Sequence, residues 1–151
     1  MTPEHERTPE QRAARSLTDE IVGEVLAADT IVIGMPLYNY SAPSTLKAWV
    51  DRIVVPGVTI GPSGGTLGGR RVVFAASRGG GYGPGTPREG WDHGEPWLRH
   101  ALSALGLDDL SFATAELTLA RESPVMIPLD LGAAEDRSMD EALSALSDLA
   151  A

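Results

Sequence analysis

Two short polar segments, each directly after an apolar run, carry the residues best suited to bind a ligand. The first follows the run 31–34 and Pro36, and it consists of Leu37, Tyr38, Asn39 and Tyr40. An apolar run that stops at a proline is typical of a buried parallel strand that ends abruptly. Open α/β sheets bind ligands at the carboxyl ends of their strands. Because Tyr and Asn both stack and hydrogen-bond, this segment predicts a site for a planar heteroaromatic molecule.

The second segment follows the apolar run 72–76 and consists of Ser77, Arg78, Gly79 and Gly80, with a third glycine at position 81. Successive glycines allow a sharp turn in which amide N–H groups point at a carbonyl or an anion of a ligand. The alternatives are a plain mobile turn for the glycines and ordinary half-buried packing for Tyr38 and Tyr40. Two such segments at neighbouring strand ends favour a binding site.

Other kinds of site lack their sequence patterns. The chain has no cysteine, which excludes disulfides, thiolate nucleophiles and cysteine-ligated metal centres. The Gly-x-Gly-x-x-Gly fingerprint, the Walker loop and the Gly-x-Ser-x-Gly elbow are also absent from the sequence. His5, His93 and His100 are not at metal-ligand spacing, so we expect no metal site.

Composition and charge describe an ordinary acidic globular protein. The chain has 151 residues, 42% of them hydrophobic, and a net charge of −9, which suits one domain with a real core. The acidic excess argues against nucleic acid and anionic lipid as partners, since both need clustered Lys and Arg. Apolar runs are far shorter than the ~20 residues that span a bilayer. The first residues lack a signal-peptide core, so we expect a cytoplasmic protein without membrane contact.

The order of predicted elements indicates the fold class. Residues 1–15 are polar and are expected to be a flexible segment, whose second half could start a helix, before a domain at 16–151. An apolar stripe starting at Ser16 predicts a helix there. Strands are predicted at 30–35, 71–77 and 110–117, and further helices at about 43–55, 95–105 and 139–149. Residues 57–70 predict a loop or short hairpin, and 78–95 a long functional loop. This alternation implies a parallel sheet with helices on both faces.

In combination, the two polar segments are similar to those of a known family. Leu37-Tyr38-Asn39-Tyr40, the following Ser44-Thr45-Leu46-Lys47 and Ser77-Arg78-Gly79-Gly80 resemble the FMN-dependent NADH azoreductases, which belong to the flavodoxin-like NAD(P)H:quinone oxidoreductases. The resemblance runs from about Leu17 to the C-terminus. It implies a flavodoxin-like three-layer α/β/α fold and a homodimer. It also implies FMN, with residues 37–40 beside the flavin ring and residues 77–80 at its pyrimidine edge.

The resemblance also implies a reaction. NADH or NADPH reduces FMN, and the flavin then passes two electrons to a quinone or azo acceptor. Because the flavin performs the chemistry, we expect no catalytic side chain. An FMN reductase or quinone reductase with another acceptor would use the same residues.

The resemblance breaks at the start of the chain. Family members begin with a strand and a serine-rich loop that binds the FMN phosphate, and the chain matches them only after that part. We therefore expect an N-terminally truncated flavodoxin-like domain in which strand 30–35 has an unpaired apolar edge. A fragment of a longer oxidoreductase is one explanation. The alternative is a genuine short protein, a non-catalytic module that dimerises or docks through the open edge.

Overall fold

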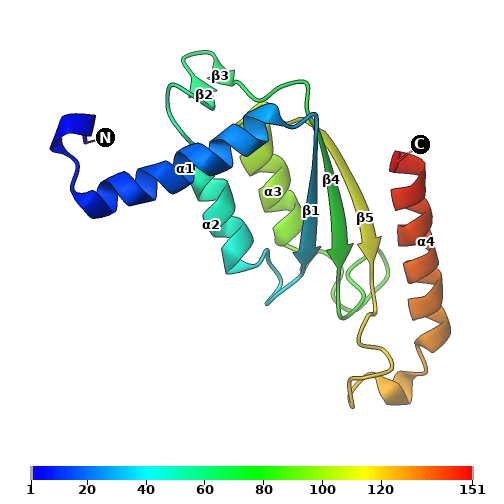
Figure 1. Cartoon of the computed structure of the whole chain (residues 1–151). Helices are drawn as coiled ribbons and strands as arrows, with labels where there is room; N and C mark the ends of the chain where they lie inside the picture. Colours follow the sequence, from blue (N-terminus) through cyan, green and yellow to red (C-terminus); the bar gives the residue numbers. More distant parts are fainter. Residues whose placement is uncertain (1, 151) are drawn as a thin grey trace.

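The computed structural model describes residues 2–150 and contains a three-stranded parallel sheet between helices (Figure 1). The strands are β1 (Thr30–Pro36), β4 (Arg71–Ser77) and β5 (Asp109–Ala115), in the order β1-β4-β5. All three are in register, so that their carboxyl ends lie at one edge of the sheet. The α/β class, the parallel sheet and the three predicted strands are confirmed.

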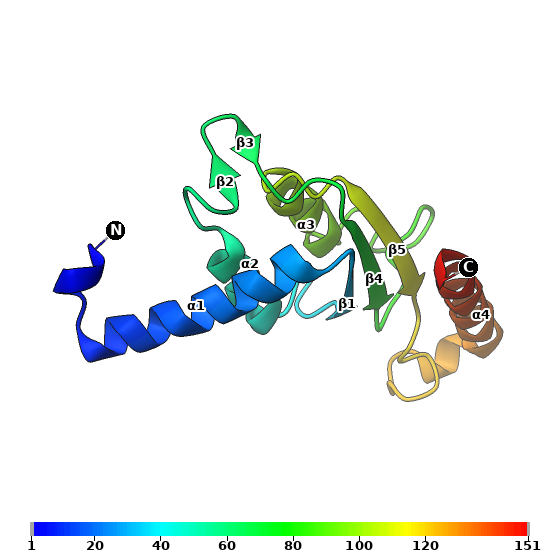
Figure 2. The same cartoon turned by 45° about the horizontal axis from the view of Figure 1, so that its top comes forward.

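Helices cover the two faces of the sheet unequally, as the two views of the molecule show (Figures 1 and 2). One face carries α1 (Pro9–Ala27), α2 (Ser44–Ile53) and α3 (Gly94–Ser103). The other face carries α4 (Gly132–Ala150), which packs mainly on β5. Short elements complete the chain: two 3-10 turns, η1 (Glu4–Glu6) and η2 (Ile127–Leu129), and an antiparallel hairpin of β2 (Ile60–Gly61) and β3 (Gly64–Gly65).

The main core lies between the sheet and the first three helices. Phe74 at the centre of β4 is fully buried, and its ring stacks on Phe112 of β5 at a centroid distance of 4.4 Å. Around it pack Met35 of β1, Ile53 of α2 and Leu98 of α3, all of them buried. Strand residues alternate between the faces of a sheet, so this core fixes the orientation of the segments that leave the strands.

β1 is an edge strand, as predicted. No other strand within residues 2–150 pairs with its outer edge. Val32 of β1 is 70% exposed, whereas its neighbour Val73 in β4 is buried. Both lie on the face of the sheet that carries α4, but α4 packs mainly on β5, at the opposite edge from β1. The apolar edge that was expected for strand 30–35 is therefore confirmed.

The first helix begins earlier than predicted. It starts at Pro9 rather than Ser16, so the expected boundary between residues 15 and 16 falls inside α1. Thr8 caps the helix: its hydroxyl accepts from the Gln11 N–H, and the Gln11 side chain accepts from the Thr8 N–H. This capping box stabilises helical turns that bury no apolar residue, which is why a search for an apolar stripe missed them.

Candidate functional site

The structure brings the two predicted segments together at the carboxyl edge of the sheet. Pro36 and Ser77 are the last paired residues of β1 and β4. Beyond them, the Leu37 N–H donates to the Ser77 carbonyl at 2.8 Å. Neighbouring strand tips at one edge are the geometry that a ligand site between them requires.

The first segment forms a tight turn whose tip has an unusual backbone. Tyr38 and Ser41 exchange two backbone hydrogen bonds, of 2.9 and 3.0 Å. The two central residues, Asn39 and Tyr40, have φ values of 50° and 66°. Left-handed backbone in a bulky residue costs free energy and is concentrated at functional sites. The turn leaves the Tyr38 side chain 60% exposed at the edge of the sheet.

An aromatic cluster stands beside this turn. The Tyr40 ring contacts Trp91 at 5.5 Å and Tyr82 at 6.3 Å between centroids, both in edge-to-face geometry. The carbonyl of Tyr40 accepts from the His93 N–H at 2.8 Å, which ties the turn to the start of α3. Sequence reasoning placed Trp91 in the glycine-rich loop, where it could cover a bound ligand, but no spacing relates it to Tyr40.

The glycine segment presents a row of unused hydrogen-bond donors. Its carbonyls are satisfied: Gly79 accepts from the Leu119 N–H and Gly80 from the Leu117 N–H, each at 3.2 Å. Within residues 2–150, by contrast, no hydrogen-bond acceptor is found for the N–H groups of Gly79, Gly80 or Gly81. Since backbone donors are seldom left without a partner, these three amides are candidate donors for a ligand or for water, although Gly80 itself is buried.

At two of these positions another side chain packs against the bare glycine backbone. A Cβ on Gly79 would lie 2.7 Å from the Leu119 Cδ1 atom, and a Cβ on Gly80 would lie 2.9 Å from the Arg88 Nη1 atom. Both distances are shorter than van der Waals contact. Both contacting atoms are the ends of flexible side chains, so the absence of a Cβ lets these side chains pack closely on the turn without being required for its conformation.

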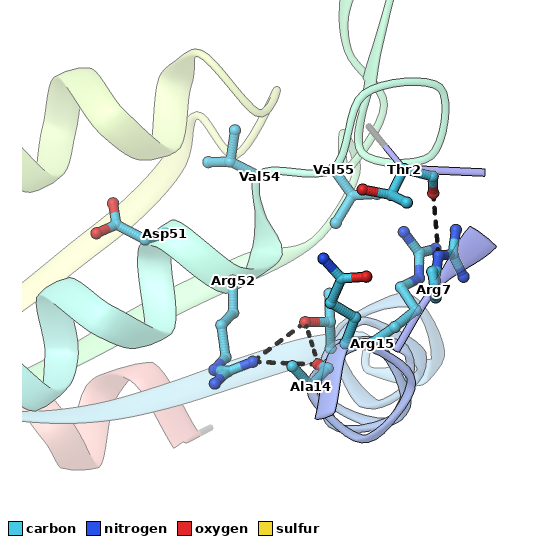
Figure 3. Close-up of a pocket in the computed structure, with 10 residues that line it drawn as sticks. Thr2, Arg7, Ala14, Arg15, Asp51, Arg52, Val54 and Val55 are labelled. Carbon is cyan, nitrogen blue, oxygen red and sulfur yellow. Dashed lines mark hydrogen bonds between the residues drawn. The ribbon is translucent and has the colours of Figure 1, made fainter. Parts of the chain in front are cut away.

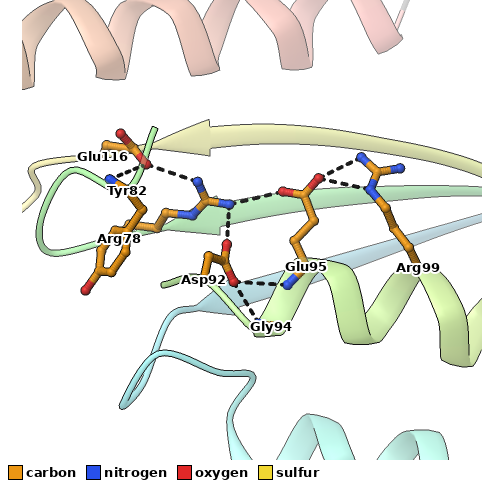
Figure 4. Close-up of polar contacts among 7 residues, drawn as sticks. All are labelled: Arg78, Tyr82, Asp92, Gly94, Glu95, Arg99 and Glu116. Carbon is orange, nitrogen blue, oxygen red and sulfur yellow. Dashed lines mark hydrogen bonds and ion pairs between the residues drawn. The ribbon is translucent and has the colours of Figure 1, made fainter. Parts of the chain in front are cut away.

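The Arg78 side chain is engaged by the protein itself (Figure 4). Its guanidinium lies 2.5 Å from Asp92, 3.0 Å from Glu95 and 3.0 Å from Glu116, and its side chain is 12% exposed. These carboxylates belong to the loop before α3, to α3 and to the segment after β5. Arg78 thus joins the ends of three elements around the glycine turn, a role that its sequence position alone did not indicate.

Two cavities differ in what their lining residues could bind. One, of about 570 Å³, borders the strand-end site and is lined by Tyr38, Asn39, Lys47 and Trp97 among others. The other, of about 380 Å³, lies between α1 and α2 (Figure 3). Its cationic lining residues are already paired within the chain: Arg52, for example, donates to Thr18 at 3.2 Å. The second cavity is therefore a poor anion site.

Neither a metal-binding cluster nor a membrane-spanning helix is found among the described residues. Among the residues described, no group of three His, Cys, Asp or Glu side chains is arranged to hold a metal ion. None of the helices in that part of the chain is both long and apolar enough to cross a bilayer.

A family model for the flavodoxin-like fold matches residues 1–141. The chain belongs to the flavodoxin-like fold family. The predicted flavodoxin-like architecture is therefore confirmed, and the strand-end turns of this flavodoxin-like chain occupy the edge where such sheets bind their ligands.

Relatives of known name agree with the family assignment. A protein of Parafrankia sp. (strain EAN1pec) named FMN-dependent NADH:quinone oxidoreductase is 47% identical over 128 residues, which are 83% of this chain and 61% of the relative. One of the same name from Methylorubrum extorquens is 44% identical over 140 residues, or 87% of this chain and 69% of the relative. The chain thus spans about 61% of the length of the first of these relatives.

The structural comparison points the same way. An FMN-dependent NADH-azoreductase from Bacillus anthracis, solved in complex with FMN, superposes with a TM-score of 0.75 at 26% identity. The match covers 95% of this chain and 67% of the azoreductase. The resemblance to the FMN-dependent NADH azoreductases and quinone oxidoreductases that the sequence predicted is therefore confirmed.

Proposed function

We propose that this chain binds the isoalloxazine ring of FMN and takes part in electron transfer from NADH or NADPH to a quinone or azo acceptor. The observation that carries the proposal is the row of three free amide donors beside the exposed tyrosine turn. The names of the relatives support the same cofactor and reaction.

The residues present fit a flavin by their chemistry. A flavin ring is flat and carries carbonyl and nitrogen acceptors, and it needs both an apolar or aromatic surface and donors in its plane. Tyr38 and Tyr40 are exposed aromatic side chains on one strand end. On the other strand end, Ser77 is exposed and precedes the glycine amides. We assign Leu37, Asn39 and the Arg78 backbone to the same site.

Bound FMN would supply the two-electron chemistry, and the protein would position the ring and adjust its affinity in each redox state. In this division of roles the Arg78 guanidinium holds the glycine turn in place, because it is already shared by three carboxylates. The tight turn at Asn39 holds the tyrosines against the site. No side chain has to transfer a proton or form a covalent bond.

We also propose that the protein forms a homodimer and that it is located in the cytoplasm. The open edge of β1 on its own favours the other candidate function, a non-catalytic module that pairs through this edge. Free donors at the strand ends have no role in such a module, so the cofactor site accounts for more of the molecule.

The proposal is tested by titrating the protein with FMN and following NADH oxidation with a quinone or an azo dye. Ser77→Ala should weaken FMN binding about threefold to tenfold, the effect of losing one hydrogen bond. The matched control is Ser63→Ala in the turn between β2 and β3, also an exposed serine, which should bind FMN as the parent protein does. A folded protein without FMN affinity or NADH oxidation would contradict the proposal.

A further inference from the structure

Arg88 lies against the glycine turn. Its Nη1 atom is 2.9 Å from the position that a Cβ on Gly80 would take, so the guanidinium covers the Gly80 backbone directly. It also stands 6.0 Å from the centre of the Tyr82 ring. In the part of the chain that the structure describes, no carboxylate lies within ion-pair distance of Arg88. Since the side chain is exposed, it is accessible to a ligand at the turn.

The charges around the turn leave Arg88 as an unmatched cation. Arg78, whose side chain is more deeply buried, is compensated by Asp92, Glu95 and Glu116. The chain as a whole has a net charge of −9, so a free guanidinium next to three free amides is a local exception. Cations and successive N–H groups at one place favour a ligand that carries or gains negative charge.

If the site binds a flavin, as the proposed function states, the chemistry of the ring determines which part of it faces these donors. The hydrogen-bond acceptors of isoalloxazine lie on its pyrimidine side and the central ring, whereas its dimethylbenzene ring has none. In the proposed site the pyrimidine edge, which carries most of the ring's acceptors, faces the free amides of Gly79, Gly80 and Gly81. Arg88, which covers Gly80, comes to lie at the same edge.

We propose that Arg88 contacts the pyrimidine edge of the flavin and makes the protein bind reduced FMN more tightly relative to oxidised FMN. Uptake of two electrons and one proton leaves the ring with one net negative charge, which is spread over the pyrimidine. A guanidinium there stabilises the reduced ring more than the neutral oxidised ring. Arg88 thereby favours the reduction of the bound cofactor by NADH or NADPH.

The test compares the dissociation constants of oxidised FMN and of dithionite-reduced FMN, measured without oxygen at a pH at which the reduced ring is anionic. Arg88→Ala should raise the ratio of the reduced to the oxidised constant about threefold to tenfold, and tenfold corresponds to about 30 mV in midpoint potential for two electrons. Arg88→Lys keeps the charge and should keep most of the effect. Arg12→Ala in α1 removes the same charge far from the strand ends and should leave the ratio unchanged.

A second titration with lumiflavin, which lacks the phosphate, separates two sources of negative charge. If Arg88 contacts the ring, Arg88→Ala changes the ratio for lumiflavin as it does for FMN. A loss of FMN affinity that is equal in both redox states and absent with lumiflavin means that Arg88 binds the phosphate, and it overturns the proposal. A ratio that changes for FMN but not for lumiflavin overturns it as well. A wild-type protein that binds neither flavin refutes the proposed function and the role of Arg88 together. Flavin binding with an unchanged ratio refutes the role of Arg88 alone.

Discussion

Replacing Arg78 by Met should destabilise the protein strongly although it removes only one side chain near the surface. The substitution keeps much of the apolar stem and deletes the guanidinium that three carboxylates share. Asp92, Glu95 and Glu116 would then face one another without a cation, with their side chains only 11%, 24% and 21% exposed. Like charges that are partly withdrawn from water repel each other and have lost their solvation.

The size of the effect follows from this burial. Removing one partner of a buried ion pair typically costs about 3–5 kcal/mol. Because the carboxylates are partly exposed, water screens some of the repulsion, and we expect a loss of about 3 kcal/mol. For a domain of this length, each kcal/mol lowers the melting temperature by about 2–4 °C, so the variant should melt about 6–12 °C below the parent.

Urea unfolding followed by circular dichroism measures this loss. Arg121→Met is the comparison, because Arg121 also bridges two carboxylates but is itself 52% exposed, with the Glu135 and Asp136 side chains 16% and 63% exposed. It should reduce stability less than Arg78→Met does. The double variant Arg78→Met/Glu116→Gln removes one of the three negative charges and should recover part of the loss. An unfolding free energy within about 1 kcal/mol of the parent for Arg78→Met would show that the cluster does not hold the turn.

Two further substitutions test contacts away from the strand ends. Thr59→Val should cost about 1–3 kcal/mol in urea unfolding, because the buried hydroxyl of Thr59 accepts from the Val55 N–H at 2.8 Å and its loss leaves that donor without a partner. An unchanged midpoint would contradict this. Asp136→Asn should lower the melting temperature at pH 7 only slightly, because the Asp136 side chain is 63% exposed. The hydrogen bond from Arg121 holds the pKa of the Asp136 carboxyl below its usual 3.8, so its stabilising effect is present above that value and is lost as the pH falls through the lowered pKa. The difference between the two proteins should therefore vanish in acid, and a difference that persists there would argue against the ion pair.

The elements that sequence reasoning predicted well are those whose signal is local. The apolar run of β4 ends at Ser77 as predicted, since a buried parallel strand needs continuous apolar residues. For the glycine-rich residues 57–70 the sequence predicted either a loop or a short hairpin, and the structure has the hairpin of β2 and β3. The start of α1 was wrong because its signal is a cap, Thr8 with Gln11, rather than an apolar face.

The partners of the site residues could not be predicted, because they depend on how distant segments meet. Arg78 finds carboxylates in the loop before α3, on α3 itself and after β5. Arg88 reaches back over Gly80 only because the loop between β4 and α3 folds onto the turn. A sequence gives the types of these residues and their order, but neither the distances nor which cation remains uncompensated.

The glycine turn explains why binding and folding are linked in this molecule. The carbonyls of Gly79 and Gly80 fasten the turn to the segment after β5, while the amides of the same residues stay free. A side chain at Gly79 would meet the Leu119 side chain, which is 45% exposed and would have to move. Substitutions in the turn that disturb its carbonyl hydrogen bonds should change ligand binding and stability together. Substitution of Arg88, whose exposed side chain makes no hydrogen bond or ion pair among the described residues, should change redox preference with little effect on stability.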